Sequence, residues 1–197
     1  MTRSGAIASN DQDRNSVPPM WLTWANALSA SRVFMALIAA VCISRELWLP
    51  AGFTFVAAIL SDLIDGPLAR YLGEASILGG KLDHSADAFF VVVILAALAV
   101  QGIVTPLLPF LITIAFLQYV FDSGVRTQQP LKASRLGRFN GIAYFIAAGI
   151  PITQNAIERS WVSEESIRFG AWVLIVSTLI SMITRLRRRR PRFQSPD

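Results

Sequence analysis

Residues 61–88 read SDLIDGPLARYLGEASILGGKLDHSADA and place four aspartates within an otherwise apolar part of the chain. The four are Asp62, Asp65, Asp83 and Asp87. A carboxylate at the centre of a lipid bilayer costs about 2.5–3.5 kcal/mol on insertion scales. If these segments lie in a membrane, their aspartates must therefore face a water-filled cavity or a cation.

The rest of the chain has the composition of a membrane protein. Of its 197 residues, 53% are apolar and only 16% are charged, whereas soluble domains carry about 25% charged residues. This composition argues against a water-soluble globule, and it argues against disorder, which requires low hydrophobicity and high charge. A spanning helix needs roughly 20 residues. We therefore predict an all-α integral membrane fold with six transmembrane helices, at 27–44, 48–71, 80–100, 104–122, 139–156 and 168–184.

The two ends of the chain are expected to lie outside these spans. Residues 1–17 are polar and are predicted to form a disordered cytoplasmic tail. The segment Pro18–Trp24 is rich in tryptophan, which favours the headgroup level, and predicts an interfacial amphipathic helix before the first span. Residues 18–184 would then form the membrane domain, and residues 185–197 a basic cytoplasmic tail that contacts anionic headgroups.

The basic residues determine the expected orientation. With both termini in the cytoplasm, fourteen lysines and arginines fall on the cytoplasmic side and three on the other side, as the positive-inside rule requires. We therefore predict cytoplasmic N- and C-termini in a multi-pass protein of a prokaryotic inner or plasma membrane. Because insertion accounts for most of the net charge of +5, no nucleic-acid partner is expected.

Helical spacing brings the acidic residues onto two faces. At 100° per residue, the second helix presents one such face and the third helix another. Residues 71–78 form the turn between them, so the two antiparallel helices can oppose these faces near their cytoplasmic ends. The face of the second helix carries Asp62, Asp65, Gly66, Ala69 and Arg70, and that of the third carries Gly79, Asp83 and Asp87.

Carboxylate oxygens without cysteine suit a hard divalent cation, Mg²⁺ or Mn²⁺, better than zinc. Four carboxylates can hold two such ions about 3.5–4 Å apart, an arrangement that serves phosphoryl-type transfer. The small residues Gly66, Ala69 and Gly79 let a bulky ligand approach the backbone, and Arg70 offers a bidentate fork for phosphate. His84 is assigned no metal, because a lone histidine more often packs or forms a hydrogen bond.

Two interpretations without catalysis are also open. In the first, the carboxylates pair with Arg32, Arg70 and Lys81 while the glycines only pack helices. Four acids against three bases would leave one charge unmatched. In the second, the carboxylates form the transit site of a divalent-cation transporter. The acids cluster at one helix end, without partners deep in the fourth to sixth helices, and this arrangement disfavours transport.

The acidic stretch resembles the signature of the CDP-alcohol phosphatidyltransferase family, D-x2-D-G-x2-A-R-x8-G-x3-D-x3-D. All eight fixed positions and all gaps match within residues 62–87, and the plan of six spans after an interfacial helix extends the resemblance over most of the chain. The resemblance implies an enzyme of phospholipid biosynthesis in the membrane. Such an enzyme transfers a phosphatidyl group from CDP-diacylglycerol, or a phospho-alcohol from a CDP-alcohol, to an acceptor and releases CMP.

The resemblance also implies roles for individual residues. Asp62, Asp65 and Asp83 match the metal ligands of the family. Asp87 matches the general base toward the acceptor hydroxyl, near the second metal ion, or alternatively a plain metal ligand. The positions that hold the cytidine and the diphosphate correspond to Gly66, Ala69, Arg70 and Gly79. Many members of the family are dimers, so a homodimer is compatible with the resemblance.

The acceptor alcohol is less clearly indicated. A phosphorylated acceptor requires basic groups near the metals, and the segment between the fourth and fifth spans supplies Arg126, Lys132, Arg135 and Arg138. The same residues are equally explained by the positive-inside rule. Residues 23–32 and 133–141 resemble the phosphatidylglycerophosphate synthase branch, although Arg138 replaces its lysine and Gly141 its threonine. Glycerol 3-phosphate is therefore the expected acceptor, with inositol phosphate, phosphatidylglycerol or another alcohol as alternatives.

Overall fold

The computed structural model describes residues 24–73, 77–122 and 135–189. These residues form helices and connecting turns, without a strand in the described ranges, so the predicted all-helical fold is confirmed. The helices are α1 (Trp24–Ser44), α2 (Trp48–Tyr71), α3 (Ile77–Val100), α4 (Leu107–Asp122), α5 (Arg135–Ala156) and α6 (Glu164–Arg189).

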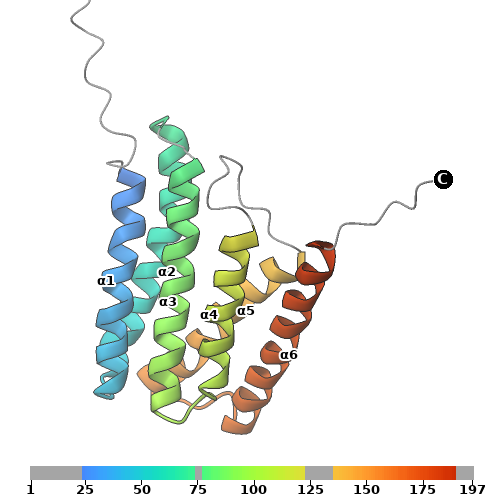
Figure 1. Cartoon of the computed structure of the whole chain (residues 1–197). Coiled ribbons are helices and arrows are strands. Elements are labelled where there is room, and N and C mark those ends of the chain that lie inside the picture. The colour runs from blue at the N-terminus through green and yellow to red at the C-terminus, as the bar shows by residue number, and fades with distance from the viewer. Residues whose placement is uncertain (1–23, 74–76, 123–134, 190–197) are drawn as a thin grey trace, which may run out of the picture.

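The helices form a bundle in which successive members run in opposite directions (Figure 1). The start of α1, the junction of α2 with α3, the end of α4 and the end of α6 therefore all lie at one end of the bundle. Of the turn expected at residues 71–78, the structure describes the beginning: α2 ends at Tyr71, and Gly73 follows with a φ of 68°, a conformation that glycine adopts without strain. The third helix begins at Ile77, so the last two residues of the expected turn are helical. This end of the bundle is where the acidic residues were expected to meet.

The packed centre of the bundle is α3. It packs against α1, α4 and α5, and its side chains Phe90, Ile94, Leu95 and Leu98 are completely buried. The first helix packs against both α2 and α3. Because α1 contacts the two helices that carry the aspartates, its side chains can reach both acidic faces.

The outer surface of the bundle is apolar, as expected for helices that face lipid. Large apolar side chains are exposed there, including Phe53, Leu63 and Phe169 at 70% each. Soluble proteins rarely expose a continuous surface of such side chains. Among the described residues, four helices are long and apolar enough to cross a membrane, as in a multi-pass membrane protein. These are α1, α2, α3 and α6; α4 is a shorter apolar helix.

Several helices extend beyond the predicted apolar segments. The first begins at Trp24, the fifth at Arg135, and the sixth covers Glu164–Arg189. The backbone hydrogen bonds of a helix continue through charged residues at its ends, whereas an apolar segment stops at the first charge. The first residues of the predicted C-terminal tail are therefore helical. The predicted tail at residues 1–17, and the interfacial helix except for Trp24, lie outside the described residues.

The contact between α2 and α5 depends on a glycine. A Cβ atom at Gly149 would lie 3.0 Å from Cε1 and 3.3 Å from Cζ of Phe55, whose side chain is buried in the core. The ring has little space to retreat. We expect Gly149→Ala to lower the free energy of unfolding by about 1–3 kcal/mol, because an added carbon overpacks this contact.

The thermal midpoint of the purified chain in detergent measures this effect. Gly170→Ala in α6 is the matched control, because a Cβ there meets no heavy atom of the described residues within 4 Å. The control should be as stable as the unaltered chain or more stable, since alanine favours a helix by about 1 kcal/mol over glycine. Equal midpoints for the two variants would show that the packing at Gly149 is not tight.

Candidate active site

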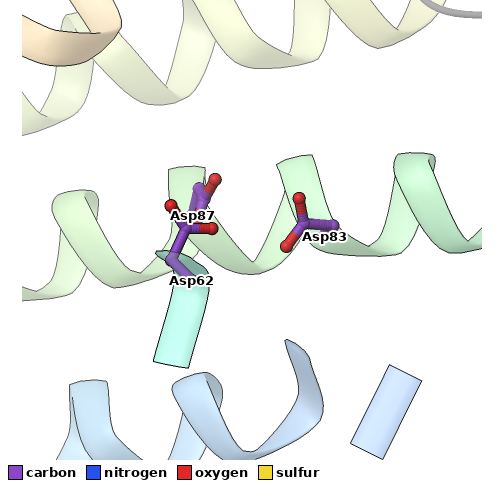
Figure 2. A group of neighbouring side chains, drawn as sticks. All are labelled: Asp62, Asp83 and Asp87. Carbon is purple, nitrogen blue, oxygen red and sulfur yellow. The ribbon is translucent and has the colours of Figure 1, made fainter. Parts of the chain in front are cut away.

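Three aspartates from two helices converge at one point. Asp62 of α2 and Asp83 and Asp87 of α3 each offer one carboxylate oxygen, and these oxygens all lie within 4.8 Å of one another. Figure 2 shows Asp83 and Asp87 on successive turns of α3, with Asp62 reaching them from the neighbouring helix. We call these residues the aspartate triad. The two acidic faces expected from helical spacing thus meet.

The fourth aspartate of the sequence motif lies deeper in the protein. The side chain of Asp65 is 6% exposed, whereas those of Asp62, Asp83 and Asp87 are 43%, 35% and 23% exposed. Its carboxylate does not belong to the group of converging oxygens found among the described residues. The structure therefore separates three accessible carboxylates from one buried carboxylate.

A single arginine contacts all four aspartates. Arg32 projects from α1, and its side chain is 1% exposed. Its Nη2 lies 3.1 Å from Asp62 Oδ1 and 2.6 Å from Asp65 Oδ2. Its Nη1 lies 2.9 Å from Asp83 Oδ1 and also pairs with Asp87 Oδ1. The ion-pair interpretation is thus correct for Arg32, but one guanidinium carries a single charge against four carboxylates.

A cavity of about 890 Å³ opens beside the aspartate triad. All three triad residues line it, whereas Arg32 and Asp65 are not among the described residues of its wall. The remaining wall comes from other residues of α3 and from α4, α5 and α6. Its polar and aromatic members include Lys81, His84, Phe116, Tyr119, Arg138, Asn140, Tyr144, Thr178, Ser181 and Arg185.

Hydrogen bonds between α5 and α6 hold the far wall of the cavity. The hydroxyls of Tyr144 and Thr178 lie 2.6 Å apart, and Ser177 Oγ donates to Asn140 Oδ1 at 2.6 Å. Polar side chains within a membrane bundle are stable when they find such partners. These contacts fix the two helices that supply Arg138 and Arg185.

Basic side chains face the cavity from three helices. They are Lys81 of α3, Arg138 of α5 and Arg185 of α6. The guanidinium carbon of Arg185 lies 4.8 Å from the ring centroid of Tyr119, a cation–π contact that orients the arginine. A cavity with carboxylates at one side and these cations at others suits a ligand that carries phosphate and is bridged to the carboxylates by metal ions.

The predicted acceptor residues divide into three groups. Arg138 lines the cavity. Arg135 begins α5 and is exposed, outside the described lining. The other two, Arg126 and Lys132, lie outside the described residues.

Sequence reasoning missed Arg185, which it placed in the basic tail. The spacing of Thr178, Ser181 and Arg185 is a usable signal, because intervals of three and four residues put them on one face of a helix.

The predicted nucleotide-binding residues lie nearer the junction of α2 and α3. Gly66, Ala69 and Arg70 occupy the last turns of α2, and Gly79 lies in the first turn of α3. A Cβ atom at Gly66 would lie 3.7 Å from Nη1 of Arg70, so the arginine side chain folds back beside this glycine. None of the four belongs to the described wall of the cavity. They border the aspartate triad along the two helices instead.

Comparison with known proteins assigns this arrangement to a family. Residues 22–183 match the model of the CDP-alcohol phosphatidyltransferase family. The chain belongs to this family. The match covers α1 to α5 completely and α6 up to residue 183, so the four aspartates, Arg32 and the cavity wall apart from Arg185 lie within the family domain. Family membership also accounts for the Asp-x2-Asp-Gly motif on α2.

Two curated relatives share part of this phosphatidyltransferase domain. The CDP-diacylglycerol–glycerol-3-phosphate 3-phosphatidyltransferase of Cereibacter sphaeroides is 29% identical over 110 residues, which are 53% of this chain and 50% of the relative. The phosphatidylcholine synthase of Mesorhizobium japonicum is 33% identical over 133 residues, which are 59% of this chain and 50% of the relative. The chain thus spans about half the length of the curated relatives it matches.

The aspartate triad fits a divalent cation, because it presents only carboxylate oxygens, the ligands that Mg²⁺ and Mn²⁺ prefer. We expect Asp83→Asn to weaken Mn²⁺ binding by at least about tenfold, since an amide oxygen carries no charge. The affinity is measured by titrating the purified chain with Mn²⁺ and following the free Mn²⁺ by electron paramagnetic resonance. Glu164→Gln, an exposed change at the far end of the bundle, is the control and should bind normally. Unchanged binding in Asp83→Asn would remove this residue from the metal site.

Proposed function

We propose that this chain transfers a phosphatidyl group from CDP-diacylglycerol to the hydroxyl of an acceptor alcohol and releases CMP. The observation that carries the proposal is the aspartate triad at the wall of a cavity that also exposes Lys81, Arg138 and Arg185. Family membership supports the same reaction class. A transporter needs a passage across the bundle, whereas here the four aspartates lie in the halves of α2 and α3 that are nearer the junction of these two helices.

In this proposal the four aspartates of α2 and α3 hold two divalent ions, Mg²⁺ or Mn²⁺. The geometry of the triad supports Asp62, Asp83 and Asp87 as ligands. Asp65 completes the ligand set by its match to the family signature. Bound ions neutralise phosphate oxygens and acidify a nearby hydroxyl. The role of the chain is to concentrate carboxylate charge beside the cavity.

Asp87 is the proposed general base. It lines the cavity, and the ion pair with Arg32 fixes its Oδ1. The acceptor oxygen forms a bond to the phosphorus nearer the lipid, and the bond from that phosphorus to the oxygen of CMP breaks. The hydroxyl proton passes to the Asp87 carboxylate. A carboxylate is a weak base, so its position beside the reacting hydroxyl matters more than its basicity.

The cytidine and diphosphate are proposed to lie along the ends of α2 and α3, against Gly66, Ala69, Arg70 and Gly79. These residues border the triad on the same two helices. Small side chains there allow a nucleotide to approach the backbone, and the guanidinium of Arg70 suits a phosphate.

The proposed acceptor is phosphorylated, with glycerol 3-phosphate as the first choice. Arg138 and Arg185 face the cavity and provide positive charge for a phosphate monoester. The segment between the fourth and fifth spans is proposed to supply further basic groups for the acceptor phosphate, namely Arg126, Lys132 and Arg135. The name of the Cereibacter relative specifies glycerol 3-phosphate for that protein. Inositol phosphate also carries a phosphate monoester, whereas phosphatidylglycerol and other alcohols lack this group and would make weaker contacts with the two arginines.

The membrane arrangement is proposed to follow the positive-inside rule. All six helices then cross the bilayer, after an interfacial N-terminal helix at Pro18–Trp24. Both termini and the aspartate triad lie on the cytoplasmic side of a prokaryotic inner or plasma membrane. Residues 18–184 form the catalytic membrane domain between the tails 1–17 and 185–197, and two copies form a homodimer.

The reaction is tested by CMP release from CDP-diacylglycerol with a panel of acceptors, in detergent micelles containing Mg²⁺ or Mn²⁺. We expect release that depends on both the acceptor and the metal. Asp87→Asn should lower kcat by at least about a hundredfold, because positioned bases contribute this much or more, while nucleotide binding persists. Near-normal turnover in this variant would overturn the base role. Absence of release with every acceptor, together with metal flux into liposomes, would instead support transport.

Acceptor recognition is tested by removing one charge at a time. Arg138→Ala and Arg185→Gln should each raise the KM for glycerol 3-phosphate by about ten- to hundredfold, the value of a hydrogen bond to a charged group. The KM for CDP-diacylglycerol should change little. Arg168→Gln, which removes an exposed arginine paired with Glu164, is the matched control. Unchanged KM values in both cavity variants would show that the acceptor carries no phosphate at this site.

A further inference from the structure

The side chain of Arg32 joins the two helices that carry the aspartates. Its Nη2 pairs with Asp62 and Asp65, both on α2. Its Nη1 pairs with Asp83 and Asp87, both on α3. Each terminal nitrogen of the guanidinium therefore contacts one helix. A planar, bidentate cation is suited to this bridging position, whereas an ammonium group presents a single nitrogen.

This guanidinium reaches the carboxylates from the side away from the cavity. Asp62, Asp83 and Asp87 line the cavity, but Arg32 does not belong to its described wall, and its side chain is 1% exposed. A substrate or metal ion that enters through the cavity thus meets the aspartates first. The arginine stands behind them on α1 and need not leave when a ligand arrives.

The charge of Arg32 is permanent. A guanidinium stays protonated in proteins at any ordinary pH, and a buried ion pair that loses one partner leaves a charge without compensation. Four ionised carboxylates with one guanidinium still sum to a negative charge of three. The arginine therefore reduces the repulsion among the aspartates without removing their attraction for divalent cations.

We propose that Arg32 is a positioning residue, the permanent counter-ion of the metal site. It holds the four aspartates together whenever the metal dissociates, and its charge weakens metal binding enough to permit exchange. This inference rests on the metal site of the proposed function, but it is independent of the acceptor alcohol. A residue that only filled space in the core would stabilise the protein equally with and without metal.

The thermal midpoint of the full chain in detergent separates these roles. It is measured with chelator and with Mn²⁺ for the unaltered chain, Arg32→Gln and the control Arg168→Gln. We expect Arg32→Gln to lower the midpoint in chelator and to show a rise with Mn²⁺ that exceeds that of the unaltered chain by about 5 °C or more. The midpoint of the control should rise with Mn²⁺ as much as that of the unaltered chain, because Arg168 forms only an exposed ion pair with Glu164.

Direct titration with Mn²⁺ supplies a second readout that does not require activity. Loss of a nearby positive charge should lower the half-saturating Mn²⁺ concentration of Arg32→Gln by about tenfold. Equal rises in midpoint for Arg32→Gln and the unaltered chain, or weaker Mn²⁺ binding in the variant, would overturn the role of Arg32 alone. A chain that Mn²⁺ neither stabilises nor binds would overturn the metal site itself.

Arg32→Lys keeps the test decisive if Arg32→Gln does not fold. Lysine retains the charge but offers one nitrogen instead of two. In chelator, the thermal midpoint of Arg32→Lys should be lower than that of the unaltered chain, and in Mn²⁺ this difference should be smaller. The half-saturating Mn²⁺ concentration of Arg32→Lys should be close to that of the unaltered chain. An equal loss of midpoint under both conditions would contradict the proposal.

Discussion

The gathering of four carboxylates inside a membrane bundle is the constraint on which the rest of the structure depends. Water compensates such charge at a protein surface, but lipid does not. The bundle meets this requirement in two ways. Arg32 neutralises part of the charge from within the protein, and the cavity leaves Asp62, Asp83 and Asp87 open to water, cations and substrate.

This constraint also explains the place of α1. The first helix packs against both α2 and α3, and Ser29, one turn before Arg32, also donates to Asp83. Thus α1, which carries no motif acid itself, joins the two helices that carry the motif acids. Around this charged centre the core of the bundle is apolar, and so is its outer surface, where side chains such as Phe53 are exposed.

The cavity depends on a second set of polar contacts. Tyr144 with Thr178 and Asn140 with Ser177 connect α5 to α6, and Tyr119 orients Arg185. These helices place the positive charges of Arg138 and Arg185 in the wall of the cavity that the aspartate triad also lines. The cavity of this CDP-alcohol phosphatidyltransferase domain thus combines carboxylates from α2 and α3 with basic side chains from α3, α5 and α6.

The sequence by itself determined the helical membrane fold and the acidic site. Both depend on local properties, namely apolar composition and the periodicity that puts Asp83 and Asp87 on one face of a helix. Only the tertiary structure decided that Asp65 is buried apart from the triad, that Arg32 bridges α2 and α3, and that Arg185 faces the cavity. These features join residues more than thirty positions apart. Periodicity can group Arg185 with Thr178 and Ser181 on one helical face, but it does not report what that face meets. The contacts depend on which helices pack side by side and on which faces they turn toward each other.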